Sequence, residues 1–78
     1  MSNVPLDLGN GYTLSIITSG VGFVEVALIH DDNGFVNTSL WFYSGSKGSD
    51  FYDDVLSYMD SDQLIIALVK AKAYAKGE

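Results

Sequence analysis

The sequence contains no cysteine and no arginine, and it has only one histidine. Without cysteine, the chain cannot form disulfides, zinc–thiolate sites, iron–sulfur clusters or a cysteine nucleophile. The lone His30 excludes metal sites built from several histidines. The longest strongly apolar stretch, residues 64–69, is far shorter than the roughly 20 residues of a membrane-spanning helix. We therefore expect a cytoplasmic, non-membrane protein with no cofactor and no metal.

Positive charge is scarce as well. Four lysines stand against ten acidic residues in a chain of 78, which gives a net charge of −6. This balance disfavours direct binding to nucleic-acid phosphates and suits a protein partner with a basic surface. Apolar residues, by contrast, make up 47% of the chain and include ten aromatic side chains. That is enough for one hydrophobic core, so we expect a single domain over residues 1–78.

Alternation of apolar and polar residues predicts three strands in the first half of the chain. Residues 1–11 show little periodicity and are interpreted as a lead-in segment, with room for one extended stretch near residues 4–8. The strands are expected at residues 12–18, 23–30 and 35–43. Turns at 19–22 and 31–34 join them, and Asn33-Gly34 is a strong hairpin signal. The prediction for residues 12–43 is therefore a three-stranded antiparallel meander.

The second half of the chain has a helical pattern. A loop rich in glycine and serine at residues 44–49 marks the change of period, and a helical region is expected over 50–76. A short helix should run through Met59, followed by a longer helix over residues 61–76. Asp60, with Gln63 three positions later, matches the capping box of that second helix.

These elements predict an α+β fold of the order β-β-β-α-α. One short and one longer C-terminal helix would pack on one face of the meander, because a sheet with an apolar face needs a cover. The expected helix contacts are Leu64, Ile65, Leu68 and Val69.

Patterns that resemble catalytic or metal-binding motifs have simpler explanations. Residues 31–34 begin like a calcium loop, but the twelfth position, which needs a glutamate, is Phe42. Residues 45–49 have the residue types of a phosphate-binding loop without its order. His30 beside Asp31 would need an activated nucleophile and an oxyanion site to form a catalytic triad, and the pattern indicates neither. We therefore expect no catalytic residues and no enzyme activity.

Acidic density is the first of two features that favour a binding function. Seven aspartates between residues 31 and 62 are opposed only by Lys47. They are Asp31, Asp32, Asp50, Asp53, Asp54, Asp60 and Asp62. These side chains either keep the chain soluble or form an electronegative patch that docks on a basic groove.

The outer face of the expected sheet is the second feature. Strand alternation projects large side chains away from the core side, namely Ile17, Phe23, Ile29, Trp41 and Tyr43. Helices can cover only one face of such a sheet, so these residues are expected to mark a binding or dimerisation surface. Phe23, Ile29, Trp41 and Tyr43 are its predicted partner contacts.

The chain resembles small phage-encoded inhibitors of host proteins, including anti-CRISPR and anti-restriction proteins. The resemblance rests on size, absence of cysteine, acidic balance and a meander-then-helix layout, exemplified by residues 24–43 and the aspartates from Asp50 to Asp62. It implies stoichiometric inhibition in the host cytoplasm, by occupation of a basic nucleic-acid-binding surface or by blocking a conformational step. The alternative is a homo-oligomeric structural or accessory protein, such as a phage assembly component, that buries its aromatic face against itself.

Overall fold

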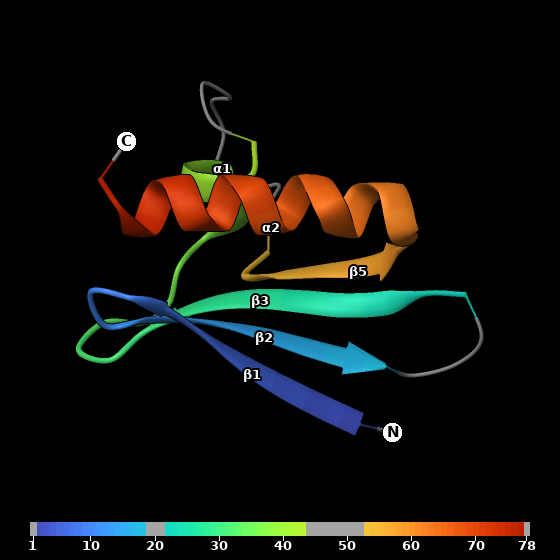
Figure 1. Ribbon diagram of the computed structural model, residues 1–78, viewed down its shortest axis with the longest axis horizontal. Helices are drawn as coiled ribbons and strands as arrows, with labels where there is room; N and C mark the ends of the chain where they lie inside the picture. The colour runs from blue at the N-terminus through green and yellow to red at the C-terminus, as the bar shows by residue number, and fades with distance from the viewer. Residues whose placement is uncertain (1, 19–21, 44–52, 78) are drawn as a thin grey trace.

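The computed structural model describes residues 2–18, 22–43 and 53–77 (Figure 1). Within them lie five strands and two helices in an α+β arrangement. The strands are β1 (Ser2–Gly9), β2 (Tyr12–Thr18), β3 (Val24–His30), β4 (Gly34–Phe35) and β5 (Val55–Met59), and the helices are α1 (Thr38–Trp41) and α2 (Ser61–Ala75). Figure 1 shows both helices on the same side of the sheet, so the fold has one sheet layer and one helical layer.

Residues 2–9 form a full strand of the sheet, where we expected a lead-in segment with at most one extended stretch near residues 4–8. β1 pairs antiparallel with β2, from Ser2 opposite Thr18 to Gly9 opposite Tyr12. The turn between them contains Asn10 and Gly11, both with positive φ, at 55° and 84°. An Asn-Gly pair suits this turn because its backbone twist matches that of the two strands. The meander is therefore β1-β2-β3 and begins one strand earlier than predicted.

β3 is the central strand of the sheet. It pairs with β2 along its whole length, which confirms strands at residues 12–18 and, from Val24 onward, at 23–30. Its other edge is shared by two short strands. β4 pairs with the end of β3, with Phe35 opposite Ile29, and β5 pairs with its beginning, with Met59 opposite Val24. The predicted hairpin at residues 31–34 is present, although its second strand has only two residues.

The hydrophobic core lies between α2 and the sheet. Leu14, Val26 and Leu28 project from β2 and β3 toward the helix and are 0% exposed. The helix meets them with a row of small side chains, Ala67, Ala71 and Ala75. Because alanine is small, this row lets the helix backbone approach the sheet closely. Four apolar contacts had been expected from α2. Of these, Leu64 and Leu68 pack beside the core, whereas Ile65 and Val69 point away from it and are exposed.

Both ends of α2 are held by side-chain hydrogen bonds. At its start, the Gln63 backbone N–H donates to Asp60 Oδ1 at 2.9 Å, and the Asp60 N–H donates to Gln63 Oε1 at 3.0 Å. The predicted capping box is thus confirmed. At its end, Asn10 Nδ2 donates to the Ala75 carbonyl at 2.9 Å, and Lys72 Nζ donates to the Leu8 carbonyl at 2.8 Å. The β1–β2 hairpin is therefore fastened to the last turns of α2.

The predicted strand at residues 35–43 is wrong beyond Phe35. The chain turns at Asn37, whose Oδ1 accepts a hydrogen bond from the Ser39 N–H at 3.0 Å and caps α1. Thr38 Oγ1 then donates to the Asp53 carbonyl at 2.7 Å. Short polar side chains that bond to nearby backbone compete with strand pairing, and here they prevail over the alternating pattern.

The predicted short helix ending at Met59 is also wrong. Residues 55–59 form β5, while residues 50–52, like the loop at 44–49, lie outside the described part of the chain. β5 contains one extra residue between the pairs Leu56–Val26 and Met59–Val24. This bulge lets Leu56 and Met59, three positions apart, both face the core, at 5% and 4% exposure. A bulged strand thereby reproduces the spacing of a helix.

Candidate functional site: the open face of the sheet

One face of the sheet is left uncovered by every helix that the structure describes. α1 and α2 both lie on the opposite side (Figure 1). Directly paired residues project to the same face, so the register identifies the side chains on the uncovered side. Three such pairs lie next to one another: Ile17–Glu25, Ala27–Val55 and Ile29–Phe35. These six residues are called the open face below.

The middle of the open face is hollow because its central residues are small. Ala27 on β3 and its neighbour Ser15 on β2 face outward, yet they are only 5% and 8% exposed. Larger side chains stand around them, and the hollow of about 310 Å³ is lined by Ile17, Ile29, Phe35 and Val55 together with Asn3, Ser15 and Glu25. Phe35 keeps 56% of its surface exposed. The hollow can therefore receive an apolar side chain of a partner.

Polar groups give the open face an acidic character. Glu25 is half-buried at the rim of the hollow, and Ser15 Oγ donates a hydrogen bond to Asn3 Oδ1 at 2.9 Å. The lysines that the structure describes lie in the other layer: Lys70 and Lys72 on α2, and Lys76 at its C-cap. Among the described residues, the open face thus carries a carboxylate and no cation, which favours a partner with positive charge.

An exposed aromatic pair extends the surface at the end of the sheet where α2 begins. The rings of Phe23 and Tyr58 meet edge to face with centroids 6.4 Å apart, and these side chains are 49% and 80% exposed. A groove of about 260 Å³ beside Phe23 reaches Asp60 and Leu64. Tyr58 has a φ of 55°, a left-handed conformation that costs a non-glycine residue about 1 kcal/mol. The β5 bulge therefore presents a large aromatic ring at some cost in backbone strain.

Two of the aromatic side chains expected on the outer face do not lie there. Trp41 is at the end of α1 and is 2% exposed, packed in the core against Phe42 at a ring distance of 5.6 Å. Its Nε1 has no hydrogen-bond partner within the described residues. Tyr43 follows α1 and belongs to no strand. The expectation of an exposed Trp41 is therefore wrong, whereas Phe23 is exposed and Ile29 lies on the open face as expected.

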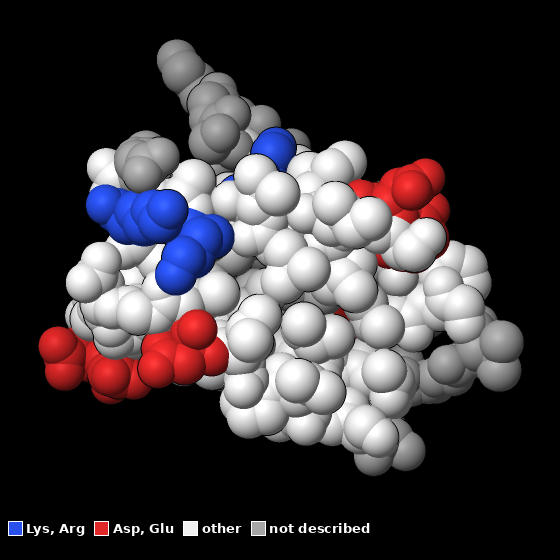
Figure 2. Space-filling model, viewed as in Figure 1, with Lys and Arg blue, Asp and Glu red and all other residues white. Residues whose placement is uncertain are grey.

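The structure places six of the seven aspartates, and they lie at three separate sites. Asp31 and Asp32 occupy the β3–β4 turn, Asp53 and Asp54 precede β5, Asp60 and Asp62 stand at the start of α2, and Asp50 lies outside the described residues. Figure 2 shows acidic side chains at two opposite ends of the visible surface with uncharged residues between them. On this side of the molecule the described aspartates do not gather into one patch, and their role in binding remains a prediction.

His30 has a structural role in the fold, whereas the pattern at residues 45–49 lies outside the described residues. His30 packs edge-on against Tyr12 with ring centroids 4.6 Å apart, and its Nδ1 accepts a hydrogen bond from the Asp32 backbone N–H at 3.2 Å. Across residues 2–18, 22–43 and 53–77, no three or more His, Asp or Glu side chains gather in a way that could hold a metal ion. None of the helices in these ranges has the length and apolar character needed to cross a membrane.

Sequence reasoning missed two members of the open face, Phe35 and Val55. Phe35 was expected in a strand. The turn after Phe35 was not anticipated, and therefore neither was the exposure of the Phe35 side chain. Val55 was expected in a helix because Val55, Leu56 and Met59 recur at helical spacing, a spacing that the bulge in β5 produces in a strand. The Asn33-Gly34 signal predicted a hairpin after β3 but not its register, because a two-residue turn at these positions would pair Asp32 with Phe35, whereas Phe35 lies opposite Ile29. No local signal places Val55 opposite Ala27.

Comparisons with known proteins add no family to these observations: no family model matches the chain, and neither a curated protein nor a solved structure matches it significantly. The function is therefore inferred from the chain's own surfaces.

Proposed function

We propose that this protein is a non-enzymatic binding module that docks its open face on the basic surface of a protein partner and inhibits that partner stoichiometrically. The observation that supports the proposal most directly is the hollow of about 310 Å³ over Ala27, with apolar walls and the carboxylate of Glu25 at its rim.

The exposed apolar side chains of the open face support a role in docking, because they contribute little to the hydrophobic core. Phe35 and Val55 keep 56% and 37% of their surface in contact with water, and Ile17 and Ile29 are only partly buried. Contiguous apolar patches bounded by polar residues are typical of interaction sites. Aromatic side chains in such a patch often contribute a large share of the binding energy. Phe35 is therefore the proposed anchor of the interface.

The charge of the chain supports a basic partner. The net charge is −6, and the described lysines lie on α2 and its C-cap, in the other layer. A partner surface that normally binds nucleic acid carries the complementary charge, and opposite fields accelerate association. In keeping with the resemblance to phage-encoded inhibitors, we propose that the target is a nucleic-acid-binding protein or complex of the host, whose basic surface the module occupies.

Self-association through the open face is the less favoured alternative. Symmetric packing of two copies would bring two Glu25 carboxylates into one largely apolar interface. No described lysine lies on that face to pair with them. Burying like charges without a counter-ion is costly, so a foreign basic partner fits this surface better than a second copy.

The test is a comparison of two variants with similar exposure on opposite layers. Phe35 on the open face and Leu40 on α1 are 56% and 57% exposed. Tagged wild type, Phe35→Ser and Leu40→Ser would be used to capture proteins from bacterial lysate across a salt series. We expect a protein that wild type and Leu40→Ser retain and that Phe35→Ser loses, and we expect Glu25→Gln to release it at lower salt. Equal retention by Phe35→Ser and Leu40→Ser would contradict docking through the open face.

Stoichiometry distinguishes inhibition from catalysis. The captured partner would be purified, and its binding to labelled nucleic acid would be titrated with the module. We expect inhibition to rise in proportion to the amount added and to end near one module per binding site. Complete and progressive loss of binding at a small fraction of that amount would indicate turnover and overturn the proposal.

A further inference from the structure

A second apolar surface lies on the side of α2 that faces away from the sheet. Ile65, Ile66 and Val69 are 60%, 47% and 66% exposed, while the alanine row on the other side of the helix is buried. This surface belongs to the opposite layer from the open face and takes no part in the proposed function. Large β-branched side chains on the outer side of a helix are unusual for a monomer, because that side normally carries polar residues.

Four residues of α2 and the C-cap residue Lys76 form one stripe that faces away from the sheet. At 3.6 residues per turn, they project within a sector of about 80° around the helix axis. In order along the helix they are Asp62, Ile65, Val69, Ala73 and Lys76. An acidic residue thus stands at the first end of the stripe, apolar residues occupy its middle, and a lysine stands at the last end. Figure 2 shows the lysines toward one end of this side of the molecule, acidic residues both below them at that end and at the opposite end, and uncharged surface between the two ends.

The order of residues in the stripe is self-complementary. In an antiparallel pair of α2 helices centred on Val69, the Val69 side chains of two copies meet at the two-fold axis. Ile65 of each copy then lies opposite the small Ala73 of the other. At both ends, Asp62 faces Lys76. A large residue opposite a small one, and an acid opposite a base, are what a symmetric contact between identical surfaces requires.

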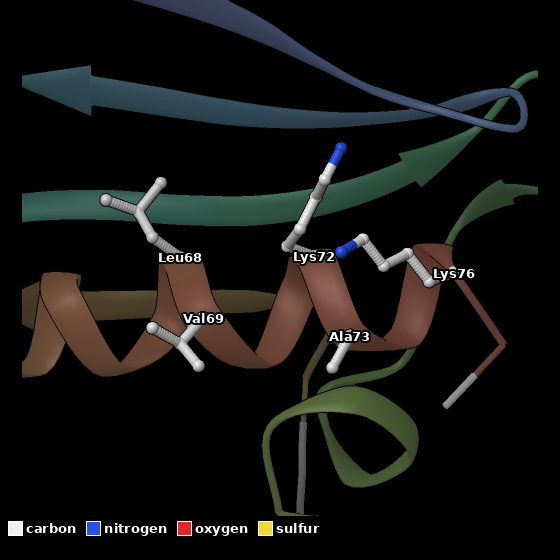
Figure 3. A pocket seen from close by; sticks show the side chains of 5 residues that line it. All are labelled: Leu68, Val69, Lys72, Ala73 and Lys76. Atoms are coloured by element: carbon white, nitrogen blue, oxygen red, sulfur yellow. The ribbon is translucent and has the colours of Figure 1, made fainter.

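A hollow in the helix surface lies where the opposing isoleucine would enter. It measures about 410 Å³ and is lined by Leu68, Val69, Lys72, Ala73 and Lys76. Figure 3 shows Val69 and Ala73 on one side of it and Leu68 and Lys72 directed toward the strands. Lys72 is fixed there by its hydrogen bond to the Leu8 carbonyl. The small side chain of Ala73 leaves room for Ile65 of a second copy between Val69 and Lys76.

We propose that α2 is a self-association surface, on which a second copy of this chain packs with its own α2 antiparallel. The pairing buries Ile65 and Val69 and joins Asp62 of each copy to Lys76 of the other. It leaves both open faces uncovered on the outside of the dimer, so that each dimer presents two partner-binding surfaces. A contact between single helices about 22 Å long is smaller than a standard interface, so we expect a dissociation constant on the order of 10⁻⁵ to 10⁻⁴ M.

Cysteine cross-linking tests the geometry without background, because the natural chain has no cysteine. We expect Val69→Cys to form covalent dimers rapidly on oxidation or with a short bismaleimide, since position 69 meets itself at the two-fold axis. Ile65→Cys should cross-link poorly alone and well when mixed with Ala73→Cys. Asp32→Cys, which is exposed in the β3–β4 turn, is the matched control for random collision. Cross-linking of Val69→Cys no faster than that of Asp32→Cys would overturn the proposal.

Charge exchange tests the pairing independently. We expect Asp62→Lys and Lys76→Asp each to weaken dimerisation by about tenfold, since each change replaces two symmetric attractions by repulsions. The double variant should recover the wild-type dissociation constant in sedimentation equilibrium. Both changes oppose the helix dipole, so a mere effect on folding would add up in the double variant instead of cancelling. A double variant as monomeric as the singles, or a wild type that stays monomeric at about 1 mM, would contradict the proposal.

Two variants distinguish failure of the α2 dimer from failure of partner binding by the open face. Val69→Lys should abolish dimerisation and leave capture of a partner by the open face in place. Phe35→Ser should do the reverse. Loss of both properties in Val69→Lys, in a protein that remains folded by circular dichroism, would show that the α2 surface binds the foreign partner, and it would overturn the assignment of this surface to a second copy.

Discussion

The two faces of the sheet are built by the same strands, but their side chains have different uses. On the face covered by α2, Leu14, Val26 and Leu28 are 0% exposed. On the open face, Phe35 and Val55 keep 56% and 37% of their surface in water. Burial of the first set stabilises the fold, whereas the second set gains little until a partner arrives. An apolar residue in a strand of this protein is therefore informative about function only once its face is known.

The largest effect that should separate the two faces comes from neighbouring residues of β3. We expect Leu28→Ala to lower the free energy of unfolding by about 3 kcal/mol, because it leaves a cavity in the core. Ile29→Ala, on the open face, should cost about 1 kcal/mol, since the side chain is already partly in water. Urea denaturation of both variants measures the difference. Equal losses of unfolding free energy would mean that the open face is covered in solution, which would contradict the proposed difference between the two faces.

The sequence allowed part of this division of faces to be predicted. Alternation placed Val26 and Leu28 on one side of β3 and Ile29 on the other, and the register confirms it. The capping box correctly fixed the start of α2. Both signals are local, because strand alternation and helix capping depend on residues within a few positions of one another. The Asn10-Gly11 turn is an equally local signal; because it was not used, the extended stretch expected near residues 4–8 was not joined to the meander.

The errors fall where distant contacts decide the structure. Leu56 and Met59 have helical spacing, but pairing with β3 and a bulge make them part of a strand. Trp41 continues an alternating pattern, yet the Asn37 cap turns its segment into a helix that places the indole in the core. The prediction of the site residues has the same errors: Ile29 was predicted correctly, Val55 was missed, and Trp41 was assigned to the wrong layer. Neither a bulge nor the partner of a short strand can be read from local sequence.

A smaller effect on the free energy of unfolding is expected at the N-cap of α2, the helix that covers the sheet. Asp60→Ala removes the carboxylate that accepts the Gln63 N–H, so we expect the free energy of unfolding to fall by about 1 kcal/mol. Asp60→Asn keeps an acceptor at the cap and should change it by only a few tenths of a kcal/mol. Denaturation at low protein concentration, below the range of the proposed dimer, measures the monomer alone. A loss as large for asparagine as for alanine would show that Asp60 acts through its charge on the helix dipole rather than through the cap.

The smallest expected effect concerns the strained backbone at Tyr58, whose side chain is not part of the core. Its ring is 80% exposed, and its φ of 55° disfavours most side chains. Tyr58→Asn and Tyr58→Ala both remove the contact with Phe23, but asparagine tolerates the left-handed conformation better. We therefore expect the asparagine variant to be more stable than the alanine variant by about 0.5 kcal/mol in paired urea denaturation curves. Equal stabilities would mean that the bulge relaxes when the ring is removed, and that Tyr58 itself sets the local backbone. A more stable asparagine variant would instead show that the pairing of β5 with β3 imposes the bulge, so that position 58 keeps its left-handed backbone whichever side chain it carries.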